Sequence, residues 1–417
     1  MHPDRPTPSA EARASKNRIM QVEEYLRQDA GNRYKVDSLY KARENEKTPK
    51  TQDRQWCSNR MRKMLVTGAG GPAGINFVNS IRIAPERISV VGTEANQYLV
   101  HLALTDSIHV IPRASRPGYI EELNKVISEE HVEFVHPQPD VEVAAISENR
   151  EKVKATVFLP SKETVRRCQD KLESAKIWEK NNIPTAKAIP LTKESDVTKA
   201  FETLGNPIWI RARQGAGGKG STPAYNVATA TSWINYWKGR GVSWKFMAQT
   251  HLPGRNVGFH SLWKNGELVT SMARERIEYI YPYLAPSGIT GTPTVQRTIH
   301  DDKINKISTE AILSIDPNFN GIACLDLKED EKGLPCVTEI NAGRMFTTSF
   351  FLSYASKTIC GNYYGNFPYL YTMVAFKERI PDIPKYNILP KDIYWIRHID
   401  APARLVRNGK IIGEMRT

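Results

Sequence analysis

The stretch PIWIRARQGAGGKGSTPAYN, residues 207–226, places four glycines within six positions between two short apolar segments. The flanking segments PIWIRAR and TPAYN are each typical of a β-strand. Basic residues stand on both sides of the glycines and among them. A glycine-rich backbone with cations nearby can bind an anion through its N–H groups. The sequence therefore predicts two strands joined by a loop that is suited to phosphate.

Two known glycine motifs offer further interpretations of the glycine-rich segments. The P-loop pattern G-x-x-x-x-G-K-[ST] does not fit, because Gly215 and Gly220 have the right separation but Ser221 follows where lysine is required. A second turn, GAGGPA at residues 68–73, fits the dinucleotide-binding fingerprint, and Glu94 ends the next predicted strand. A nicotinamide-dependent oxidoreductase is therefore one alternative, although no later residues suggest hydride transfer.

The composition of the 417-residue chain is that of a globular protein, with 40% hydrophobic and 25% charged residues. No apolar run approaches the ~20 residues that cross a membrane, and the N-terminus lacks the apolar stretch of a secretory signal. Five scattered cysteines without a CxxC pair are typical of reduced thiols, which favours the cytoplasm. The net charge of +13 leaves nucleic-acid binding as an alternative, carried mainly by the N-terminal segment.

Hydrophobic patterns divide the chain into four parts. Residues 1–62 form a polar, basic extension, in which NRIMQVEEYLRQ predicts an amphipathic helix. Residues 63–165 alternate strand and helix in the manner of a Rossmann-like parallel sheet. Residues 166–400 begin with a helix and continue with alternating strands and turns, and residues 401–417 are expected to be a tail. The extension is expected to be dispensable for chemistry.

The segment CLDLKEDEKGLPCVTEINAGR, residues 324–344, carries the residues best suited to chemistry. Its pattern predicts a hairpin, and strand alternation places Glu339 and Asn341 on one face. Asp326 lies opposite them if the hairpin is tight. Two carboxylates and an amide oxygen are suited to Mg²⁺ that bridges nucleotide phosphates. The alternative interpretation is a sheet whose polar residues simply face solvent.

Together these segments resemble the ATP-grasp superfamily, most closely the carbamoyl-phosphate synthase large-chain type. The likeness covers about residues 63–400 and includes LVTGAGGPAG, DKLESAKIWEKNNIPT, FMAQTHLPG and TEINAGR in the order of that family. It implies an α/β fold, in which a Rossmann-like pre-ATP-grasp domain precedes an α+β ATP-grasp domain with a lid subdomain at about residues 188–255. The glycine-rich loop resembles the lid that is mobile without ATP and closes over it. One ATP-grasp unit, without an amidotransferase segment, distinguishes the chain from a full synthase.

The resemblance implies an ATP-dependent ligase that requires Mg²⁺ or Mn²⁺. Such an enzyme joins a small-molecule carboxylate to an amine, forming a C–N bond, or to a thiol, through an acyl phosphate, and releases ADP and phosphate. We expect a cytoplasmic protein with no membrane partner, with nucleic acid disfavoured and a second copy of the chain as the partner. The remaining alternative is a non-catalytic ATP-grasp-like protein that binds nucleotides or nucleic acid.

The resemblance implies roles for the residues of this sequence that stand at the positions of the family's motifs. The nucleotide would be bound by Lys171, Arg211, Gln214, Gly215, Ala216, Gly217, Gly218, Gln249, Thr250, His251 and Leu252. The metal ligands would be Asp326, Glu339 and Asn341, and the catalytic residues would be Arg344 together with the substrate-facing Arg274 and Arg276.

Two departures from the family pattern raise the question of weakened or lost activity. Thr250 follows Gln249 where many members have a glutamate, and Asn256 replaces an acid expected near Gly254-Arg255. Acidic side chains at these places usually hold the adenine amine or the ribose hydroxyls. Ala342-Gly343 also replaces a single proline and delays Arg344 by one position.

Overall fold

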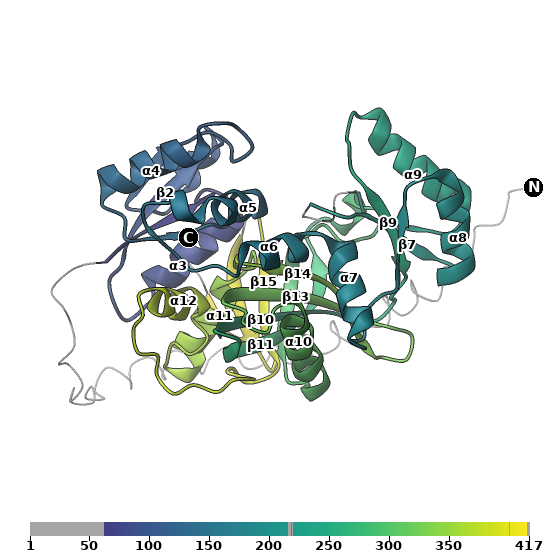
Figure 1. The fold of residues 1–417 in the computed structure, drawn as a ribbon. Helices are drawn as coiled ribbons and strands as arrows, with labels where there is room; N and C mark the ends of the chain where they lie inside the picture. Colours follow the sequence, from purple (N-terminus) through teal and green to yellow (C-terminus); the bar gives the residue numbers. More distant parts are fainter. Residues whose placement is uncertain (1–61, 216–217, 219, 400, 415–417) are drawn as a thin grey trace, which may run out of the picture. The chain divides into compact units, whose positions relative to one another are not determined.

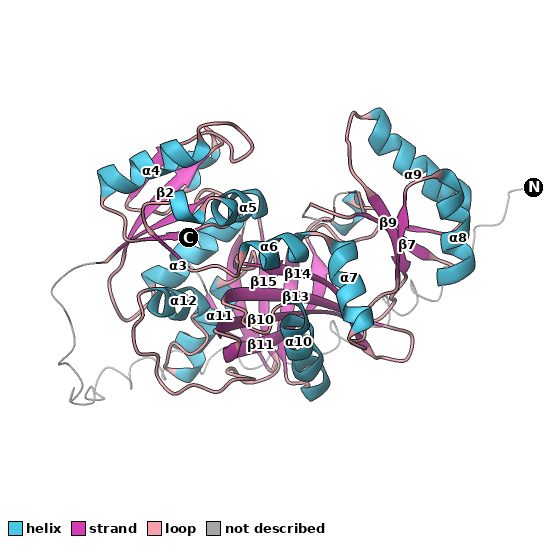
Figure 2. Ribbon diagram, viewed as in Figure 1, coloured by secondary structure: helices cyan, strands magenta, loops and turns pink. Residues whose placement is uncertain are grey.

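The computed structural model describes residues 62–414 except 216, 217, 219 and 400, and it describes only the backbone of residues 401–403. The chain divides into two units, Met1–Arg60 and Met61–Thr417, and the described residues belong to the second. Three sheets follow one another along this unit (Figures 1 and 2). The amphipathic helix expected near residues 17–28 and Cys57 lie outside the described residues.

The first sheet is parallel, with the strand order β3-β2-β1-β4-β5. Its strands are β1 (Lys63–Thr67), β2 (Ser89–Glu94), β3 (Ser107–Val110), β4 (Phe134–His136) and β5 (Thr156–Val157), and its helices are α3 (Pro72–Arg82), α4 (Tyr119–Glu130) and α5 (Asp140–Glu148). The strand order changes direction between β1 and β4. In open parallel sheets, ligands bind beyond the carboxyl ends of the strands at such a point, which here means residues 68–74 and 138–140.

The second sheet is antiparallel, with the order β6-β9-β7-β8. It comprises β6 (Ala188–Leu191), β7 (Ile208–Ala212), β8 (Thr222–Ala224) and β9 (Phe246–Thr250), with helices α8 (Glu194–Leu204) and α9 (Val227–Gly239) beside it (Figure 1). In β7, Ile208, Ile210 and Ala212 are buried while Trp209 and Arg211 alternate with them. Because strand side chains alternate between faces, this pattern directs Arg211 away from the helix-covered core.

The third sheet is antiparallel and has eight strands, in the order β14-β13-β10-β11-β12-β15-β16-β17. They are β10 (Asn256–Lys264), β11 (Glu267–Tyr279), β12 (Pro293–Ile299), β13 (Gly321–Glu329), β14 (Pro335–Ala342), β15 (Ile393–His398), β16 (Ala401–Arg407) and β17 (Lys410–Glu414). The last two strands extend the sheet within residues that we expected to be a tail. Asn408 and Gly409, both with positive φ, form the two-residue turn that joins these strands.

Two cores cover opposite faces of the third sheet. Leu325 and Ile340 pack with the helices α7 (Lys171–Lys180) and α10 (Asp302–Ile315), and α6 (Lys162–Gln169) lies against β14 on this side. On the other face Ile322 packs with α11 (Phe350–Ala355) and α12 (Phe367–Ala375). Short helical turns lie at Leu99–Leu102, Arg150–Lys152, Pro282–Leu284 and Ser356–Cys360. The expected mixed α/β fold class is confirmed.

The apolar character of the helices and the state of the cysteines can be read from the described residues. No helix among them is long and apolar enough to span a bilayer. The four described cysteines, Cys168, Cys324, Cys336 and Cys360, are all free thiols.

Candidate active site

A cavity of about 560 Å³ is lined by residues from all three sheets. The first sheet contributes the loop after β1 and the segment 138–140, and the second contributes Trp209, Arg211 and Gln249. The third sheet contributes the floor, including Asp326, Glu339 and Asn341, and the loop 287–293 forms a further wall. Segments far apart in the sequence therefore meet at one site.

The two predicted acidic residues stand next to each other on this floor. Asp326 on β13 pairs directly with Glu339 on β14, and Cys324 pairs with Asn341 in the same ladder. Paired residues of an antiparallel ladder share one face of the sheet, so Asp326, Glu339 and Asn341 all face the cavity. The carboxyl groups of Asp326 and Glu339 lie within hydrogen-bonding reach of each other.

Different surroundings separate the ionisation of the two carboxyl groups. Burial raises the pKa of Asp326, with the ion pair to Arg276 opposing this and the charge of Glu339 adding to it. Burial also acts to raise the pKa of Glu339, but the charges of Arg211 and Lys171 outweigh it and lower that pKa. Glu339 is therefore the carboxylate that stays ionised most readily.

Two cations face Glu339 from the other side of the cavity. Arg211 Nη2 lies 2.6 Å from Glu339 Oε2, and Lys171 Nζ lies 3.5 Å from the same oxygen. Lys171 is only 7% exposed, and burial lowers its pKa against the opposing charge of Glu339. Its Nζ also donates to the carbonyl of Gly215 at 2.7 Å, so Lys171 contacts the first described part of the glycine-rich loop.

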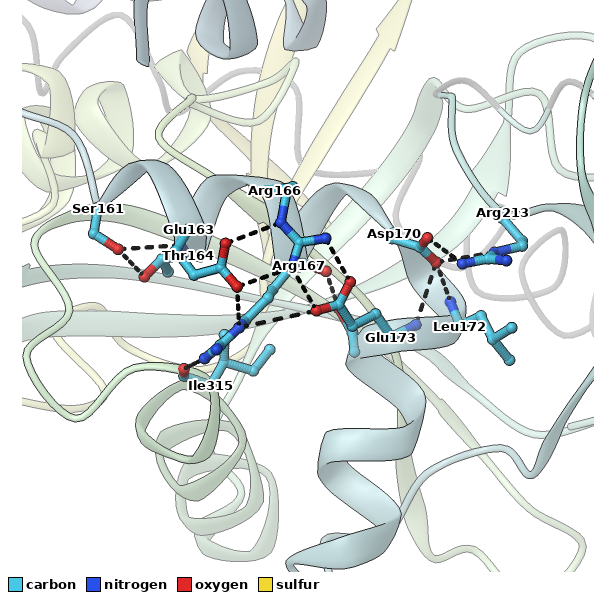
Figure 3. Close-up of polar contacts among 11 residues, drawn as sticks. Ser161, Glu163, Thr164, Arg166, Arg167, Asp170, Leu172, Glu173, Arg213 and Ile315 are labelled. Atoms are coloured by element: carbon cyan, nitrogen blue, oxygen red, sulfur yellow. Dashed lines mark hydrogen bonds and ion pairs between the residues drawn. The ribbon is translucent and has the colours of Figure 1, made fainter. Parts of the chain in front are cut away.

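Contacts of Asp170 at the start of α7, drawn in Figure 3, fix where the next residue, Lys171, lies. Asp170 caps this helix by accepting bonds from the N–H groups of Leu172 and Glu173 at 3.1 and 3.2 Å. The same carboxylate forms an ion pair with Arg213, at the end of β7, and the N–H of Lys171 donates to the carbonyl of Arg213 at 3.0 Å. The first turn of α7 is thus fastened to the strand that leads into the loop.

A more exposed network of charges lies on the preceding helix, α6 (Figure 3). Arg166 bonds both Glu163 and Glu173, at 2.8 and 2.9 Å, while Arg167 bonds Glu163 at 3.0 Å. These side chains join α6 to α7 but do not line the cavity. Exposed ion pairs contribute little to stability, so we assign this network no part in the site.

Arg344 enters the cavity despite its displaced position in the sequence. Strand β14 ends at Ala342, and Gly343 adopts a φ of +83°, a conformation that L side chains rarely take. This turn brings Arg344 Nη2 to 2.6 Å from the side-chain oxygen of Asn341. Its Nε forms an ion pair with Asp140 of the first sheet. The extra residue relative to the family pattern is thus absorbed in one glycine turn.

The two predicted arginines on β11 have different partners. Arg276 forms an ion pair with Asp326 and donates to the side-chain oxygen of Asn256 at 3.0 Å. Arg274 donates to Gln296 at 2.5 Å. Asn256, which stands where the family often has an acid, therefore serves as the neutral partner of a buried guanidinium.

The residues present fit a bound Mg²⁺ ion. Two adjacent carboxylates and one amide oxygen offer hard oxygen ligands, the kind that Mg²⁺ prefers, and three cations now neutralise those carboxylates. No group of three or more His, Cys, Asp or Glu suited to a metal occurs in the part of the chain that the structure describes. Asp326, Glu339 and Asn341 would thus need phosphate oxygens or water to complete the coordination of the ion, as is usual for Mg²⁺ bound together with nucleotide phosphates.

Most predicted nucleotide ligands line this one cavity. Those that do are Lys171, Arg211, Gly215, Gly218, Gln249, Thr250 and Leu252. Gln214 and His251 do not line it, and Ala216 and Gly217 lie outside the described residues. All six predicted metal and catalytic residues line the cavity as well.

Several lining residues were not predicted from the sequence. They are Asp140, Trp209, Tyr279, Phe346 and Thr348, together with the loop at 287–293. Asp140 could have been flagged, since it ends the apolar segment VEFVHPQPD of the Rossmann-like region, and parallel sheets bind ligands beyond the carboxyl ends of their strands. The others gave no signal beyond ordinary apolar or polar character.

Glu94 does not have the surroundings that a dinucleotide requires. It is 7% exposed, and its carboxylate accepts bonds from the N–H groups of Gly70, Ala95 and Asn96 at 3.2, 3.0 and 3.1 Å. A ribose-binding acid must keep its oxygens free for hydroxyl groups. In this protein the carboxylate instead stabilises the turn after β1.

Comparison with known proteins gives structural likeness at low sequence identity. The biotin carboxylase domain of Hydrogenobacter thermophilus 2-oxoglutarate carboxylase, solved with MgADP, ADP and bicarbonate, is similar with a TM-score of 0.61 and 15% identity over 83% of this chain and 75% of that chain. An L-amino acid ligase from Bacillus licheniformis has a TM-score of 0.61 and 14% identity over 81% and 79%. Carboxyaminoimidazole ribonucleotide synthase from Aspergillus clavatus, complexed with ATP, has a TM-score of 0.60 and 16% identity over 81% of each chain.

No protein-family model matches the chain, and no curated protein matches it. The solved structures named above are all ATP-grasp enzymes. The chain therefore has the ATP-grasp fold with a preceding Rossmann-like domain, as the resemblance of its motifs implied.

Proposed function

We propose that this protein is an ATP-dependent ligase that joins a carboxylate to an amine or a thiol through an acyl phosphate. The observation that carries this proposal is the pairing of Asp326 and Glu339 on the cavity floor, opposite Lys171 and Arg211. Similar structures that hold MgADP or ATP support it. The finer resemblance to carbamoyl-phosphate synthase and the C–N bond type belong to the same proposal.

The nucleotide would lie between the second and third sheets. Lys171 and Arg211 would contact its phosphates, because a buried ammonium and a planar guanidinium bind phosphate oxygens well. Gln249 is 2% exposed, and its side-chain nitrogen has no hydrogen-bond partner. This donor, with Thr250 and Leu252 beside it, would face the base or ribose, in place of the acids usual in the family.

The metal would be held by Asp326, Glu339 and Asn341. When bound, Mg-ATP supplies the phosphoryl group that activates a carboxylate as an acyl phosphate. Binding would require Arg211 and Lys171 to exchange Glu339 for phosphate oxygens, since both cations now contact that carboxylate. Asp326 would likewise give up part of its contact with Arg276.

Catalysis would consist mainly of positioning and charge neutralisation. Arg344 is fixed by Asp140 and Asn341, so its guanidinium is preorganised where negative charge develops on the transferred group. The substrate carboxylate would lie between Arg344 and the turn after β1, at the point where the first sheet changes strand direction. Arg276 would contact the substrate from the side of β11. The loops at 68–74 and 287–293, which line the cavity, would exclude water from the acyl phosphate.

The two alternatives receive less support. The hydrogen bonds of Glu94 argue against a nicotinamide cofactor at the first sheet. A purely nucleotide-binding protein would not need Arg344 held beside the metal ligands. We propose that residues 63–165 are the pre-ATP-grasp domain and that residues 166–400, together with the strands β16 and β17 that extend the third sheet, are the ATP-grasp domain. A homodimer is the form to test, since one similar structure is a domain dimer.

The direct experiment is a coupled ADP-release assay with Mg-ATP and a panel of acids, each combined with amines or thiols. Release that depends on both an acid and Mg²⁺ is expected, and an acyl hydroxamate should form when hydroxylamine is the amine. The control is Glu331→Gln, which changes an exposed carboxylate on the β13–β14 turn. ATP binding without release under any combination would favour the non-catalytic alternative.

A further inference from the structure

Arg274 is a buried cation without an anionic partner. It lies in the middle of β11, is 3% exposed and lines the cavity. Its Nη1 donates to the amide oxygen of Gln296, and its guanidinium lies 3.9 Å from the centre of the Phe346 ring. Its Nε has no hydrogen-bond partner. Within the described ranges no carboxylate lies at ion-pair distance from Arg274.

The other guanidinium groups of the cavity provide a contrast. Arg211 contacts Glu339, Arg276 contacts Asp326, and Arg344 contacts Asp140. Buried charges in proteins are normally paired in this way, because desolvation of an isolated charge is very unfavourable. Arg274 departs from this rule, and its pKa falls to about 9, mainly through burial and then through the charge of Arg276.

The sheet leaves room for this arrangement. Gly258 on β10 pairs directly with Arg274, and a Cβ atom at Gly258 would lie 3.3 Å from Cζ of Arg274 and 3.2 Å from Nη2 of Arg276. Any larger residue would press on both guanidinium groups. The sequence thus holds two like charges together in a buried place, which favours a bound anion between or beside them.

The position of Arg274 separates it from the expected phosphate site. Glu339, Asp326, Gly258 and Arg274 occupy one continuous row across β14, β13, β10 and β11. With strands about 4.8 Å apart, the backbone of Arg274 lies roughly 10 Å beyond that of Asp326. Lys171 and Arg211 approach the opposite end of this row, at Glu339.

We propose that Arg274 binds an oxyanion of the substrate that is distinct from the carboxylate to be activated. The acid would then be a dicarboxylate or a phosphorylated acid, held by Arg274 with Thr348 beside it. Thr348 lines the cavity, is 1% exposed and accepts a bond from Gln296 at 2.9 Å, so it is fixed by the partner of Arg274. This assignment rests on the proposed ligase function, because it names the class of its acid substrate.

The test measures binding rather than turnover. Melting temperature and calorimetric binding are followed with succinate, with its monoanionic analogue butyrate, and with inorganic phosphate. Succinate or phosphate should bind the parent and raise its melting temperature, and butyrate should have a much smaller effect. Arg274→Met should weaken that binding by about 10- to 100-fold, and Arg274→Lys should restore part of it. The probe that binds distinguishes a carboxylate subsite from a phosphate subsite.

A structural role for Arg274 would give a different result. Because methionine removes an unpaired buried charge, Arg274→Met without ligand should melt at the parent temperature or above it. A lower melting temperature together with unchanged binding of succinate and phosphate would overturn the proposal. So would loss of the phosphate response in Arg211→Ala but not in Arg274→Met, since the anion would then occupy the nucleotide site.

Failure of this assignment can be told apart from failure of the ligase proposal. If no acid supports ADP release but succinate or phosphate binds through Arg274, the anion subsite stands without the ligase function. If monocarboxylates with no second anionic group support ADP release as well as dicarboxylates do, the ligase stands and the subsite does not.

Discussion

Asp326 and Glu339 pair directly across adjacent strands, yet the pKa of Asp326 is raised and that of Glu339 is lowered. The difference comes from their neighbours on each side. Glu339 faces two cations from the helix α7 and the strand β7, whereas Asp326 is more strongly affected by its own burial and faces one arginine. One carboxylate of the pair is thus kept charged while the other is closer to protonation, as expected for two acids held close together.

Glu339→Gln should abolish most turnover while the fold survives. The substitution keeps the size of the side chain but removes the charge that faces Arg211 and Lys171 and that would bind the metal. We expect ADP release to fall by at least about 100-fold, and the concentration of Mg²⁺ needed for nucleotide binding to rise. Glu331→Gln, on the exposed turn of the same hairpin, is the matched control. Equal ADP release from Glu339→Gln and the parent would refute the metal assignment.

Asp170→Asn should weaken ATP binding without unfolding α7. Asparagine caps helices as well as aspartate does, so the variant mainly removes the ion pair with Arg213. Lys171 would then lose part of its attachment to the end of β7, and ATP affinity should fall roughly tenfold. Glu163→Gln alters the exposed network on α6 (Figure 3) and should leave ATP affinity unchanged. Similar affinities for both variants and the parent would count against this role of Asp170.

The hairpin of the site could be predicted from the sequence because its pattern is local. Alternation alone places Glu339 and Asn341 on one face, and a short turn brings Asp326 opposite them. The same argument applies to β7, where apolar residues alternate with Arg211. Short-range periodicity is thus sufficient for the strands that hold the charged groups.

Contacts between distant segments could not be predicted in this way. The ion pair of Arg344 with Asp140 joins residues 204 positions apart, and no periodicity in either segment indicates the other. Helix α12 is buried along nearly its whole length, so the sequence FPYLYTMVA lacks the polar face that marks a surface helix. The unpaired state of Arg274 likewise depends on which side chains reach it across the sheet.

Residues 1–60 should be dispensable for nucleotide binding. The described residues that line the cavity begin at Gly68, and the first strand of the described unit begins at Lys63. Arg62 contacts Glu86 and Glu378, so the shortened chain should begin at Met61 to keep these pairs. We expect Mg-ATP affinity within about twofold of the parent. A soluble shortened chain that no longer binds Mg-ATP would show that the extension takes part in the site.

Mg-ATP should protect the glycine-rich loop from hydrogen exchange. Lys171 now donates to the carbonyl of Gly215, and nucleotide phosphates would compete for this cation while offering acceptors to the loop N–H groups. Peptides that cover residues 214–221 should exchange more slowly with Mg-ATP, and Arg211→Ala should reduce this protection. The turn at residues 330–333 serves as an internal control. Protection by NAD at residues 68–74 instead would favour the oxidoreductase alternative.

Glu142→Gln should stabilise the protein at alkaline pH but not at acidic pH. Glu142 is 6% exposed, and one of its oxygens has no hydrogen-bond partner. Burial, with a smaller effect of Glu94, raises its pKa to about 7 despite a bond from Thr67. Since the folded-state pKa lies above the unfolded value of 4.5, the folded protein holds a proton that the unfolded chain releases between these two pH values. Its folding free energy therefore weakens as the pH rises through this window.

The size of this effect follows from the shift. A rise of the pKa from 4.5 to about 7 corresponds to a loss of about 3 kcal/mol in the free energy of unfolding of the parent. This loss is absent below pH 4.5 and complete above pH 7. Glutamine has the same shape and never ionises, so the free energy of unfolding of Glu142→Gln should exceed that of the parent at pH 8 and match it near pH 4.5. Urea unfolding at both pH values measures the difference, with Glu121→Gln on the exposed face of α4 as control. If the advantage of Glu142→Gln is the same at both pH values, the carboxyl group does not titrate between them, because only a change of its charge can make the difference depend on pH.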